Sequence, residues 1–375
     1  MKVAILGTRG IPNHYGGFEQ FAEYLSSGLV ELGHEVYVYN SHTHPYQLKL
    51  WKGVNIIHKY DPENKIGTVG QFIYDFNCIR DCRHRNFDII LQLGYTSSSI
   101  WGRWLPKQAI IITNMDGLEW KRTKYSKPVQ RFLKYAEKLG IKYSDFLVAD
   151  SIGIKRYLKD KYQVQARYIP YGATIFRHPS MNFIKPYASE PYSYDMLIAR
   201  LEPENSLDII LEGVSASSTS RIFLVIGNYL SAYGTYLKNK YEGEKIKFIG
   251  TIYDMDILNN LRYYSNLYLH GHTVGGTNPS LLEAMASYAL VVAHHNEFNS
   301  SILDNDAFYF TDCKQVQLIL ETVKKNTPKA QLKINSNIEK VNKLYTWEKI
   351  IKDYEQMMLN SINKISKKLA VTEDL

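Results

Sequence analysis

The sequence predicts an α/β protein built from two doubly wound parallel sheets, and three observations lead to this fold class. Short apolar runs alternate with helical patterns along most of the 375 residues. Several runs are apolar at every position, as in Ala109-Ile110-Ile111-Ile112, which is typical of strands covered on both faces. The alternation stops once, in the Pro-, Ser- and Tyr-rich stretch 176–194, and then restarts, which indicates two domains.

The predicted elements follow in chain order. A helix over 18–32 ends at Gly33, a residue that favours helix C-termini, and a final amphipathic helix begins at Thr346. We expect domains over 1–175 and 176–345, a closing helix and tail over 346–375, and a ligand site in a cleft between the domains. Strands are expected at 2–6, 35–39, 54–58, 88–92, 109–113, 146–149 and 168–170, and after the linker at 195–198, 222–226, 247–249, 267–269, 291–293 and 308–310.

Composition and charge indicate which kinds of partner the protein can bind. The net charge of +8 favours an anionic partner such as nucleic acid, phospholipid or a phosphorylated substrate. We expect no nucleic-acid partner, because no known nucleic-acid module is visible. No run approaches the roughly 18 apolar residues of a membrane span, and the N-terminus lacks the features of a signal peptide, so a cytoplasmic protein is expected.

The cysteines give little support for a metal site. Cys78 and Cys82 lie four residues apart with His84 nearby, but a metal site needs more ligands in register. Reduced cysteines on a helix are the favoured interpretation. No Asp-x-Asp motif occurs in a suitable position, so we expect no metal and no cofactor.

A glycine-rich loop directly follows the first predicted strand. It runs from Gly7 to Glu19, includes Gly16 and Gly17, and leads into a helix whose N–H groups suit an anion. It lacks the Gly-x-Gly-x-x-Gly turn of a dinucleotide site. A purely structural loop remains the alternative, although the loop is longer than packing requires.

Charged and aromatic residues follow the strand over 109–113. Asp116 is the candidate for a catalytic or orienting carboxylate, and an Asp that caps the next turn is the alternative. The basic stretch that follows has apolar residues at helical spacing, which suits either an anionic lipid surface or an ordinary solvated helix face. The candidates for acceptor or membrane contact are Glu119, Trp120, Lys121, Arg122, Arg131, Lys134 and Lys138.

The second domain carries the strongest candidates for ligand binding. Arg200 follows the strand over 195–198, where a guanidinium can meet a diphosphate bidentately. Asn278 is a good N-cap and Pro279 a good first helical residue, so this helix start suits an anion. Glu283 lies one turn further in and can accept hydrogen bonds from a ribose; a core helix with a chance Glu is the alternative. The remaining candidates for donor binding are Gly227, Gly275, Gly276, Thr277 and Ser280.

At these residues the whole chain resembles glycosyltransferase family 4, of GT-B fold. Arg200-Leu201-x-Pro203-Glu204 is similar to that family's phosphate-binding strand end, and Leu282-Glu283-Ala284-Met285-Ala286 to its donor-binding helix. Tyr345-Thr346-Trp347-Glu348 resembles the start of a helix that crosses back to the first domain. The loop over 7–19 and the segments 116–122 and 275–280 resemble a branch of bacterial rhamnosyltransferases that build capsular, O-antigen or cell-wall polysaccharides.

The resemblance implies a function and a set of partners. The donor would be a nucleotide-sugar, with dTDP-β-L-rhamnose favoured, and the acceptor a lipid-diphosphate-linked saccharide at the inner face of the cell membrane. The first domain would bind the acceptor and the second the donor. The sugar would be transferred with retention and without metal, with Asp116, Arg200 and Glu283 as the catalytic residues.

The sequence departs from the family pattern at three places. Gly275 stands where family 4 usually has the first of two glutamates, and Asn205 replaces a usual lysine, which removes one cation from the diphosphate. Residues 114–116 occupy the place of a usual histidine. Three rival functions stay open: a nucleotide-sugar epimerase of the same fold, a nicotinamide oxidoreductase, and a non-catalytic sugar- or lipid-binding scaffold.

Overall fold

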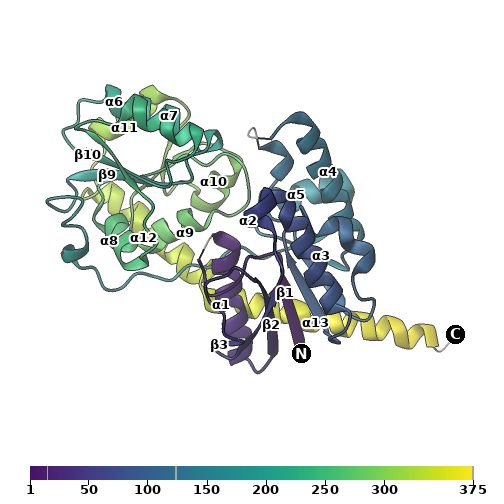
Figure 1. Ribbon diagram of the computed structural model, residues 1–375. Coiled ribbons are helices and arrows are strands. Elements are labelled where there is room, and N and C mark those ends of the chain that lie inside the picture. Colours follow the sequence, from purple (N-terminus) through teal and green to yellow (C-terminus); the bar gives the residue numbers. More distant parts are fainter. Residues whose placement is uncertain (15, 123–124, 374–375) are drawn as a thin grey trace. The chain divides into compact units, whose positions relative to one another are not determined.

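The computed structural model describes residues 1–14, 16–122 and 125–373, and the chain divides into two compact units (Figure 1). Unit 1 contains Met1–Trp120, Ser126–Tyr171 and the chain from Trp347 onward. Unit 2 contains Gly172–Thr346 together with Lys121, Arg122 and Tyr125. The chain therefore leaves unit 1 briefly after Trp120, and again after Tyr171, before its last helix returns.

Unit 1 is built on an eight-stranded sheet with the order β3-β4-β2-β1-β5-β6-β7-β8. All neighbours pair in parallel except β3, which runs antiparallel to β4. The sequence order reverses between β1 and β5, so this pair marks the switch point where an open α/β sheet binds ligands. The strands are β1 (Lys2–Leu6), β2 (Glu35–Ser41), β3 (Leu50–Trp51), β4 (Val54–Lys59), β5 (Ile89–Leu93), β6 (Ile110–Asn114), β7 (Phe146–Ala149) and β8 (Ala166–Tyr168).

Helices cover both faces of this sheet. Right-handed crossovers on either side of the switch point place α1 on one face and α3 and α4 on the other. Buried residues of α3 pack with the strands in one hydrophobic cluster. The elements are α1 (Gly17–Glu31), α2 (Glu63–Ile66), η1 (Gly67–Val69), α3 (Gly70–Cys82), η2 (Ser99–Trp104), η3 (Glu119–Lys121), α4 (Lys127–Lys142), α5 (Ile152–Tyr162) and α13 (Trp347–Glu373).

The last helix, α13, packs against α1 of unit 1, as the resemblance implied. The Tyr24 and Trp347 rings stack with centroids 4.4 Å apart, and His34 Nε2 lies 2.8 Å from a Glu355 carboxylate oxygen. A Cβ on Gly28 would come within 2.4 Å of the Ile351 side chain, so a larger residue there would force Ile351 to move.

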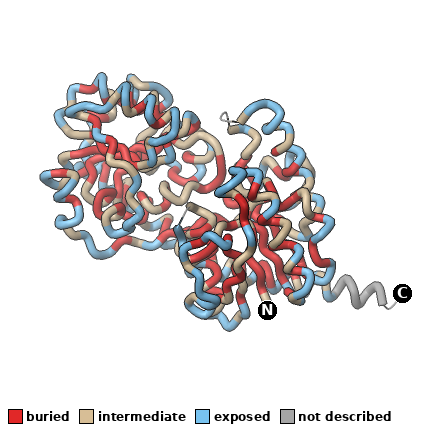
Figure 2. Tube along the Cα trace, in the orientation of Figure 1, coloured by how far each residue is buried: buried red, intermediate tan, exposed pale blue. Residues whose placement is uncertain are grey.

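Unit 2 contains a six-stranded parallel sheet with the order β11-β10-β9-β12-β13-β14. Its switch point lies between β9 and β12. Figure 2 shows that the strands at the centre of each unit are buried. The strands are β9 (Tyr194–Ile198), β10 (Ile222–Ile226), β11 (Ile246–Gly250), β12 (Tyr268–His270), β13 (Val291–His294) and β14 (Phe308–Phe310).

The helices of unit 2 form a layer on each side of its sheet. Figure 1 shows α6, α7 and α11 on one side and α8, α9 and α12 on the other. Apolar residues of α6, α7, α11 and α12 share one buried cluster with the strands. The elements are η4 (Met181–Phe183), η5 (Pro203–Asn205), α6 (Leu207–Ala216), α7 (Ala232–Tyr241), α8 (Met255–Tyr264), α9 (Pro279–Ala286), α10 (Glu297–Leu303), α11 (Cys313–Thr322) and α12 (Pro328–Leu344).

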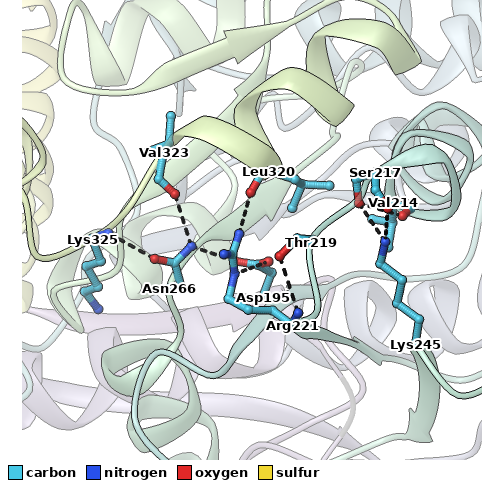
Figure 3. A network of polar contacts seen from close by, with 10 residues as sticks. All are labelled: Asp195, Val214, Ser217, Thr219, Arg221, Lys245, Asn266, Leu320, Val323 and Lys325. Atoms are coloured by element: carbon cyan, nitrogen blue, oxygen red, sulfur yellow. Dashed lines mark hydrogen bonds and ion pairs between the residues drawn. The ribbon is translucent and has the colours of Figure 1, made fainter.

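A polar network lies at the amino ends of β9 and β10, the edge opposite the switch-point loops (Figure 3). Arg221 Nε donates to Asp195 at 2.9 Å, and Asn266 Nδ2 donates to the other Asp195 oxygen at 3.0 Å. The Lys325 backbone N–H donates to Asn266 Oδ1 at 3.0 Å. These bonds satisfy buried polar groups and fasten the segment after α11 to the sheet.

The two-sheet α/β fold predicted from the sequence is confirmed, and each expected strand overlaps an observed one. The boundaries differ by one or two residues at several strands, such as β8, which ends at Tyr168 rather than running over 168–170. The two-residue strand β3 was not predicted, because so short a segment carries no readable periodicity. Among the described residues, no helix has the length and apolarity that a membrane crossing requires.

Candidate functional site

Two loops meet at the carboxyl ends of β9 and β12, the switch point of unit 2. Arg200 comes two residues after β9 and is exposed, and η5 follows it. The Thr273 N–H, in the loop after β12, donates to the Glu204 carbonyl at 3.0 Å. His272 Nδ1 lies 2.8 Å from Asn205 Oδ1. These contacts fix the loop that carries Arg200 against the loop that leads to α9.

The amide group of Asn205 links the loop after β9 to the loop after β12. Its Nδ2 donates to the Arg200 carbonyl at 2.7 Å, while its Oδ1 faces His272. The side chain is therefore committed to the loop backbone and to an imidazole. Asn205 therefore contributes hydrogen bonds to the site and no positive charge.

Two neutral histidines lie beside these loops. Burial lowers the pKa of His272 to about 3, and the positive charges of Arg122 and Arg200 lower it further in the same direction. Burial, followed by the neighbouring His272, lowers the pKa of His270 to about 3. Both rings are uncharged near neutral pH, so neither adds positive charge beside these loops.

The start of α9 has the cap geometry that the sequence predicts. Asn278 Oδ1 accepts a hydrogen bond from the Ser280 N–H at 2.9 Å, with Pro279 in the first helical position. The Ser280 hydroxyl lies 2.7 Å from the hydroxyl of buried Tyr268. Gly275 has φ +134°, which only glycine adopts readily, and a Cβ there would lie 3.0 Å from His272 Nε2. The glycine loop therefore runs past the histidine into the helix start.

Glu283 is held by a residue that sequence reasoning missed. Arg262, from α8, has only 1% of its side chain exposed, and its Nη2 lies 2.5 Å from Glu283 Oε2. Arg262 occurs in an amphipathic helix, where an arginine is ordinarily assigned to the solvated face, so no signal in the sequence marked it. The pair orients the Glu283 carboxylate; breaking such a buried pair costs about 3–5 kcal/mol.

The donor-binding candidates of the second half of the chain all lie in unit 2. Gly227 follows β10, and a Cβ on it would lie 2.1 Å from the Ala199 carbonyl oxygen, directly before Arg200. Thr277 is buried, as are Gly275 and Gly276. Gly227 therefore lies beside the end of β9 that carries Arg200, and residues 275–280 form the approach to α9.

Asp116 lies in unit 1, in the loop after β6. The Met115 N–H donates to the Val148 carbonyl at 2.8 Å, and Asn114 Nδ2 donates to the Tyr354 hydroxyl of α13 at 3.3 Å. Burial raises the pKa of Tyr171 well above its usual value, and the Asp116 charge is the next contribution. Asp116 is thus a partly exposed carboxylate at the carboxyl edge of the sheet, beside buried tyrosines.

The glycine loop after β1 is organised by side chains of unit 1. The Arg9 N–H donates to Glu19 at 2.8 Å, and the Arg9 guanidinium forms a bidentate pair with Glu63 at 2.8 and 2.6 Å. Gly16 is the N-cap residue of α1 and Gly17 its first residue. Tyr15 lies outside the described residues.

The aromatic and basic candidates separate into two environments. The Trp120 indole N–H donates at 3.1 Å to Glu137, which is buried, and Lys134 and Lys161 lie 4.8 and 5.0 Å from the indole ring centroid. Glu137 also accepts a hydrogen bond from Tyr157 at 2.7 Å. The sole acid in the basic stretch is therefore an internal anchor rather than part of a solvated face. Four basic candidates are exposed: Arg131, Lys134, Lys138 and Lys121. Glu119 is half-buried.

Arg122 lies in a different environment from the neighbouring candidates. The structure assigns it to unit 2, where its Nη1 lies 3.9 Å from carboxylate oxygens of both Glu202 and Glu204. The acceptor or membrane contact expected of Arg122 stays a prediction. No local pattern groups Arg122 with the loop after β9, because the contact joins distant parts of the chain.

The described residues contain no cluster of three or more His, Cys, Asp or Glu side chains that could hold a metal ion. Cys78 and Cys82 are buried in α3. Burial raises the pKa of the Cys82 thiol to about 12, so its thiolate, the form that binds metals and attacks electrophiles, is strongly disfavoured. Both cysteines belong to the hydrophobic core of unit 1.

Comparison with solved structures defines the fold. The chain is similar to sucrose-phosphate synthase from Thermosynechococcus elongatus, with 16% identity and a TM-score of 0.76, over 96% of this chain and 98% of that one. It is similar to HepE from Anabaena in complex with UDP and glucose, with 14% identity and a TM-score of 0.74, over 96% and 100%. A trehalose-phosphate synthase (UDP-forming) from Burkholderia xenovorans gives 11% identity and a TM-score of 0.72, over 96% and 100%.

These likenesses span nearly the whole chain, and the fold is that of the GT-B glycosyltransferases, as the sequence predicts. Residues 1–174 match a family described as a domain of unknown function, DUF1972. No curated protein sequence matches the chain.

Proposed function

We propose that the protein is a glycosyltransferase that binds a nucleotide-sugar in unit 2 and transfers the sugar to an acceptor. The observation that carries the proposal is the meeting of the Arg200 loop and the His272–Gly275 loop at the switch point of a GT-B fold, beside the start of α9. A guanidinium near a capped helix N-terminus suits the diphosphate of such a donor.

The donor that we favour is dTDP-β-L-rhamnose. The support is the resemblance of the segments 7–19, 116–122 and 275–280 to rhamnosyltransferases of polysaccharide synthesis. In this proposal Arg200 and the amides of Thr277–Ser280 bind the diphosphate, and the Gly16–Gly17 loop closes over it. Glu283, oriented by Arg262, holds the deoxyribose hydroxyl. The acceptor is a lipid-diphosphate-linked saccharide of capsule, O-antigen or cell-wall synthesis.

The proposed chemistry needs no metal and keeps the anomeric configuration. The bond between the anomeric carbon and the phosphate oxygen breaks, and the acceptor hydroxyl oxygen bonds to that carbon on the same face. The acceptor proton passes to the leaving phosphate oxygen. Arg200 and the α9 amides stabilise the charge that builds on the leaving diphosphate, and Asp116 orients the acceptor or stabilises the oxocarbenium-like sugar.

A UDP-sugar donor is the second candidate. One observation favours it: a structure of similar fold, HepE from Anabaena, is described in complex with UDP-glucose, with a TM-score of 0.74. Both donors carry the same diphosphate, so the phosphate contacts proposed above serve either one. The two donors differ in the base and in the sugar.

A transfer assay tests the proposal. Purified protein is incubated with dTDP-β-L-rhamnose, UDP-glucose or GDP-mannose, each with and without a lipid-diphosphate-linked disaccharide, and the products are resolved by mass spectrometry. We expect an acceptor heavier by one deoxyhexose, together with free dTDP, only when rhamnose donor and acceptor are both present. Conversion of donor without acceptor would indicate an epimerase, and no consumption of any donor would support a non-catalytic scaffold.

We also propose that unit 1 binds the inner membrane surface through α4. Exposed Arg131, Lys134 and Lys138 lie along this helix, with partly exposed Val129 (40%) and Tyr135 (57%) among them. Cations interspersed with accessible apolar groups suit an anionic interface. This location would place the enzyme where a lipid-linked acceptor is found.

A further inference from the structure

The His272 side chain joins the two loops of the candidate donor site. It lies two residues after the end of β12, in the loop that leads to α9, and its ring is half-buried. Its Nδ1 lies 2.8 Å from Asn205 Oδ1, in the loop after β9 that also carries Arg200. The ring is therefore held at the carboxyl edge of the unit 2 sheet, where the donor diphosphate is proposed to bind.

The hydrogen bonds of Asn205 determine which nitrogen of His272 carries the proton. Asn205 Nδ2 donates to the Arg200 carbonyl, which can only accept, so the amide oxygen Oδ1 is the atom that faces the ring. An amide oxygen also only accepts, and His272 Nδ1 must therefore be the donor.

The His272 ring is neutral, because burial lowers its pKa to about 3. The nearby Val274 carbonyl favours the charged ring, but its effect on the pKa is smaller than that of burial. A neutral imidazole with its proton on Nδ1 has a lone pair on Nε2. His272 Nε2 is therefore a hydrogen-bond acceptor.

Gly275 leaves space beside this acceptor. A Cβ at position 275 would lie 3.0 Å from His272 Nε2 and 3.8 Å from Cε1. Apart from the chain neighbours of Gly275, no other atom of the described residues comes within 4 Å of that Cβ position. The backbone φ of +134° also disfavours any side chain at this position. The loop before α9 therefore leaves unfilled the space next to Nε2 that a side chain would occupy.

A neutral acceptor at this place suits the sugar of a nucleotide-sugar better than its phosphates. Phosphate oxygens accept hydrogen bonds and would be repelled by the Nε2 lone pair, whereas sugar hydroxyl groups donate them. The sugar is bonded directly to the diphosphate, so its hydroxyls reach the groups that surround the phosphate site. A carboxylate would accept the same hydrogen bond but would add negative charge beside the diphosphate, and the imidazole does not.

We propose that His272 is a specificity residue for the donor sugar: its Nε2 accepts a hydrogen bond from a sugar hydroxyl, which enters the space left by Gly275. This inference rests on the proposed function and extends it from the diphosphate to the sugar. Asn205 acts through His272, because its amide oxygen fixes the proton on Nδ1 and so keeps Nε2 an acceptor.

The test compares ligands that differ only in the sugar. Calorimetric titrations with dTDP, dTDP-β-L-rhamnose, UDP and UDP-glucose are run on the wild type, His272→Asn and His272→Gln. The amide of His272→Asn takes the place of Nδ1 and keeps a donor for Asn205, whereas the longer side chain of His272→Gln brings an amide oxygen to the place of Nε2. His178→Asn is the matched control, because it changes an exposed histidine of the same unit.

The quantity of interest is the ratio of the Kd of the nucleoside diphosphate to the Kd of the matching sugar donor. We expect this ratio to exceed one in the wild type and to fall by about 3- to 10-fold in His272→Asn, the range of one lost neutral hydrogen bond. The affinity of His272→Asn for the nucleoside diphosphate alone should not change. His272→Gln should keep part of the ratio, and His178→Asn all of it.

The nucleoside diphosphate separates sugar recognition from support of the loops. If His272 only fastens the two loops, His272→Asn weakens the diphosphate and the sugar donor equally, and that result overturns the inference. An unchanged ratio in His272→Asn, or a wild type that gains no affinity from the sugar, also overturns it and leaves the proposed function standing. A wild type that binds neither dTDP nor UDP overturns the proposed function and this inference together.

Discussion

At the scale of single residues, Asp116 is the side chain on which the proposed chemistry depends in unit 1. Asp116→Asn keeps the shape of the side chain and removes its charge. We expect turnover to fall by about 100-fold or more, measured as dTDP release with saturating donor and acceptor. Asp160→Asn, an exposed change on α5 of the same unit, is the matched control and should keep wild-type turnover. Wild-type turnover in Asp116→Asn would remove this residue from the mechanism.

Lys325 makes the stability of the protein depend on pH. Burial lowers the pKa of Lys325 from 10.5 to about 7, and its ammonium donates to the Tyr263 carbonyl. Between these two pKa values the unfolded chain binds more protons than the folded one, so stability rises with pH in that window. The contribution is complete above 10.5, is lost as pH falls toward 7, and has a slope of at most about 1.4 kcal/mol per pH unit.

Urea unfolding between pH 7.5 and 9.5 measures this effect. We expect the free energy of unfolding of Lys325→Met to gain less with rising pH than that of the wild type. Lys324→Met, an exposed neighbour, should follow the wild type. Parallel pH profiles for wild type and Lys325→Met would show that the Lys325 amine titrates normally in the folded protein.

Several residues of the candidate site could be predicted from the sequence, and others could not. Asn278 and Pro279 were identified as a helix start because capping depends on neighbours in the chain. Arg262 and the buried Glu137 could not be identified, because an isolated charge in an amphipathic helix has the same local pattern whether it pairs inside or faces solvent. His272 could have been noticed, since a histidine between a buried strand and a glycine loop lies at the ligand edge of a sheet.

At the scale of elements, α4 combines an internal anchor with an outward basic face. Glu137 fastens the helix through Trp120 and Tyr157, so changes to the exposed cations should leave its position intact. We expect Arg131→Glu/Lys134→Glu/Lys138→Glu to reduce sedimentation with vesicles that contain phosphatidylglycerol, and binding of the wild type to weaken with salt.

A variant of unit 2 in which three lysines are replaced by glutamate is the control for net charge. Lys314→Glu/Lys324→Glu/Lys343→Glu changes three exposed lysines outside α4. This variant should bind anionic vesicles as the wild type does. Unchanged vesicle binding by the α4 variant, or equal loss in both variants, would contradict a specific membrane role for this helix.

The elements themselves were largely predictable because both sheets are parallel. Strands such as β6 and β10 are buried on both faces and therefore appear as uninterrupted apolar runs. The antiparallel pair β3–β4 is different: β3 is a two-residue edge strand, set by pairing with Val54 and Asn55 rather than by its own pattern. Local sequence specifies the first kind of strand, and tertiary pairing specifies the second.

At the scale of the whole molecule, the chain passes from unit 1 to unit 2 and returns through α13, which packs on α1. Unit 2 also contains Lys121, Arg122 and Tyr125, although the chain before and after them belongs to unit 1. No local sequence pattern predicts that these residues belong to unit 2. One polypeptide thus builds two units with largely parallel sheets, as in the GT-B fold.

The central claim is that unit 2 binds a nucleotide diphosphate at its switch point through Arg200. Thermal unfolding of the wild type and Arg200→Gln, each with dTDP, UDP or thymidine, tests it most directly. Arg200 is exposed, so the variant should fold. A ligand at 100 times its Kd stabilises the folded state by about 2.7 kcal/mol. We expect dTDP to raise the Tm of the wild type clearly and that of Arg200→Gln much less, with no difference for thymidine. A Tm that neither diphosphate raises in the wild type, or that both raise equally in the variant, would contradict the account.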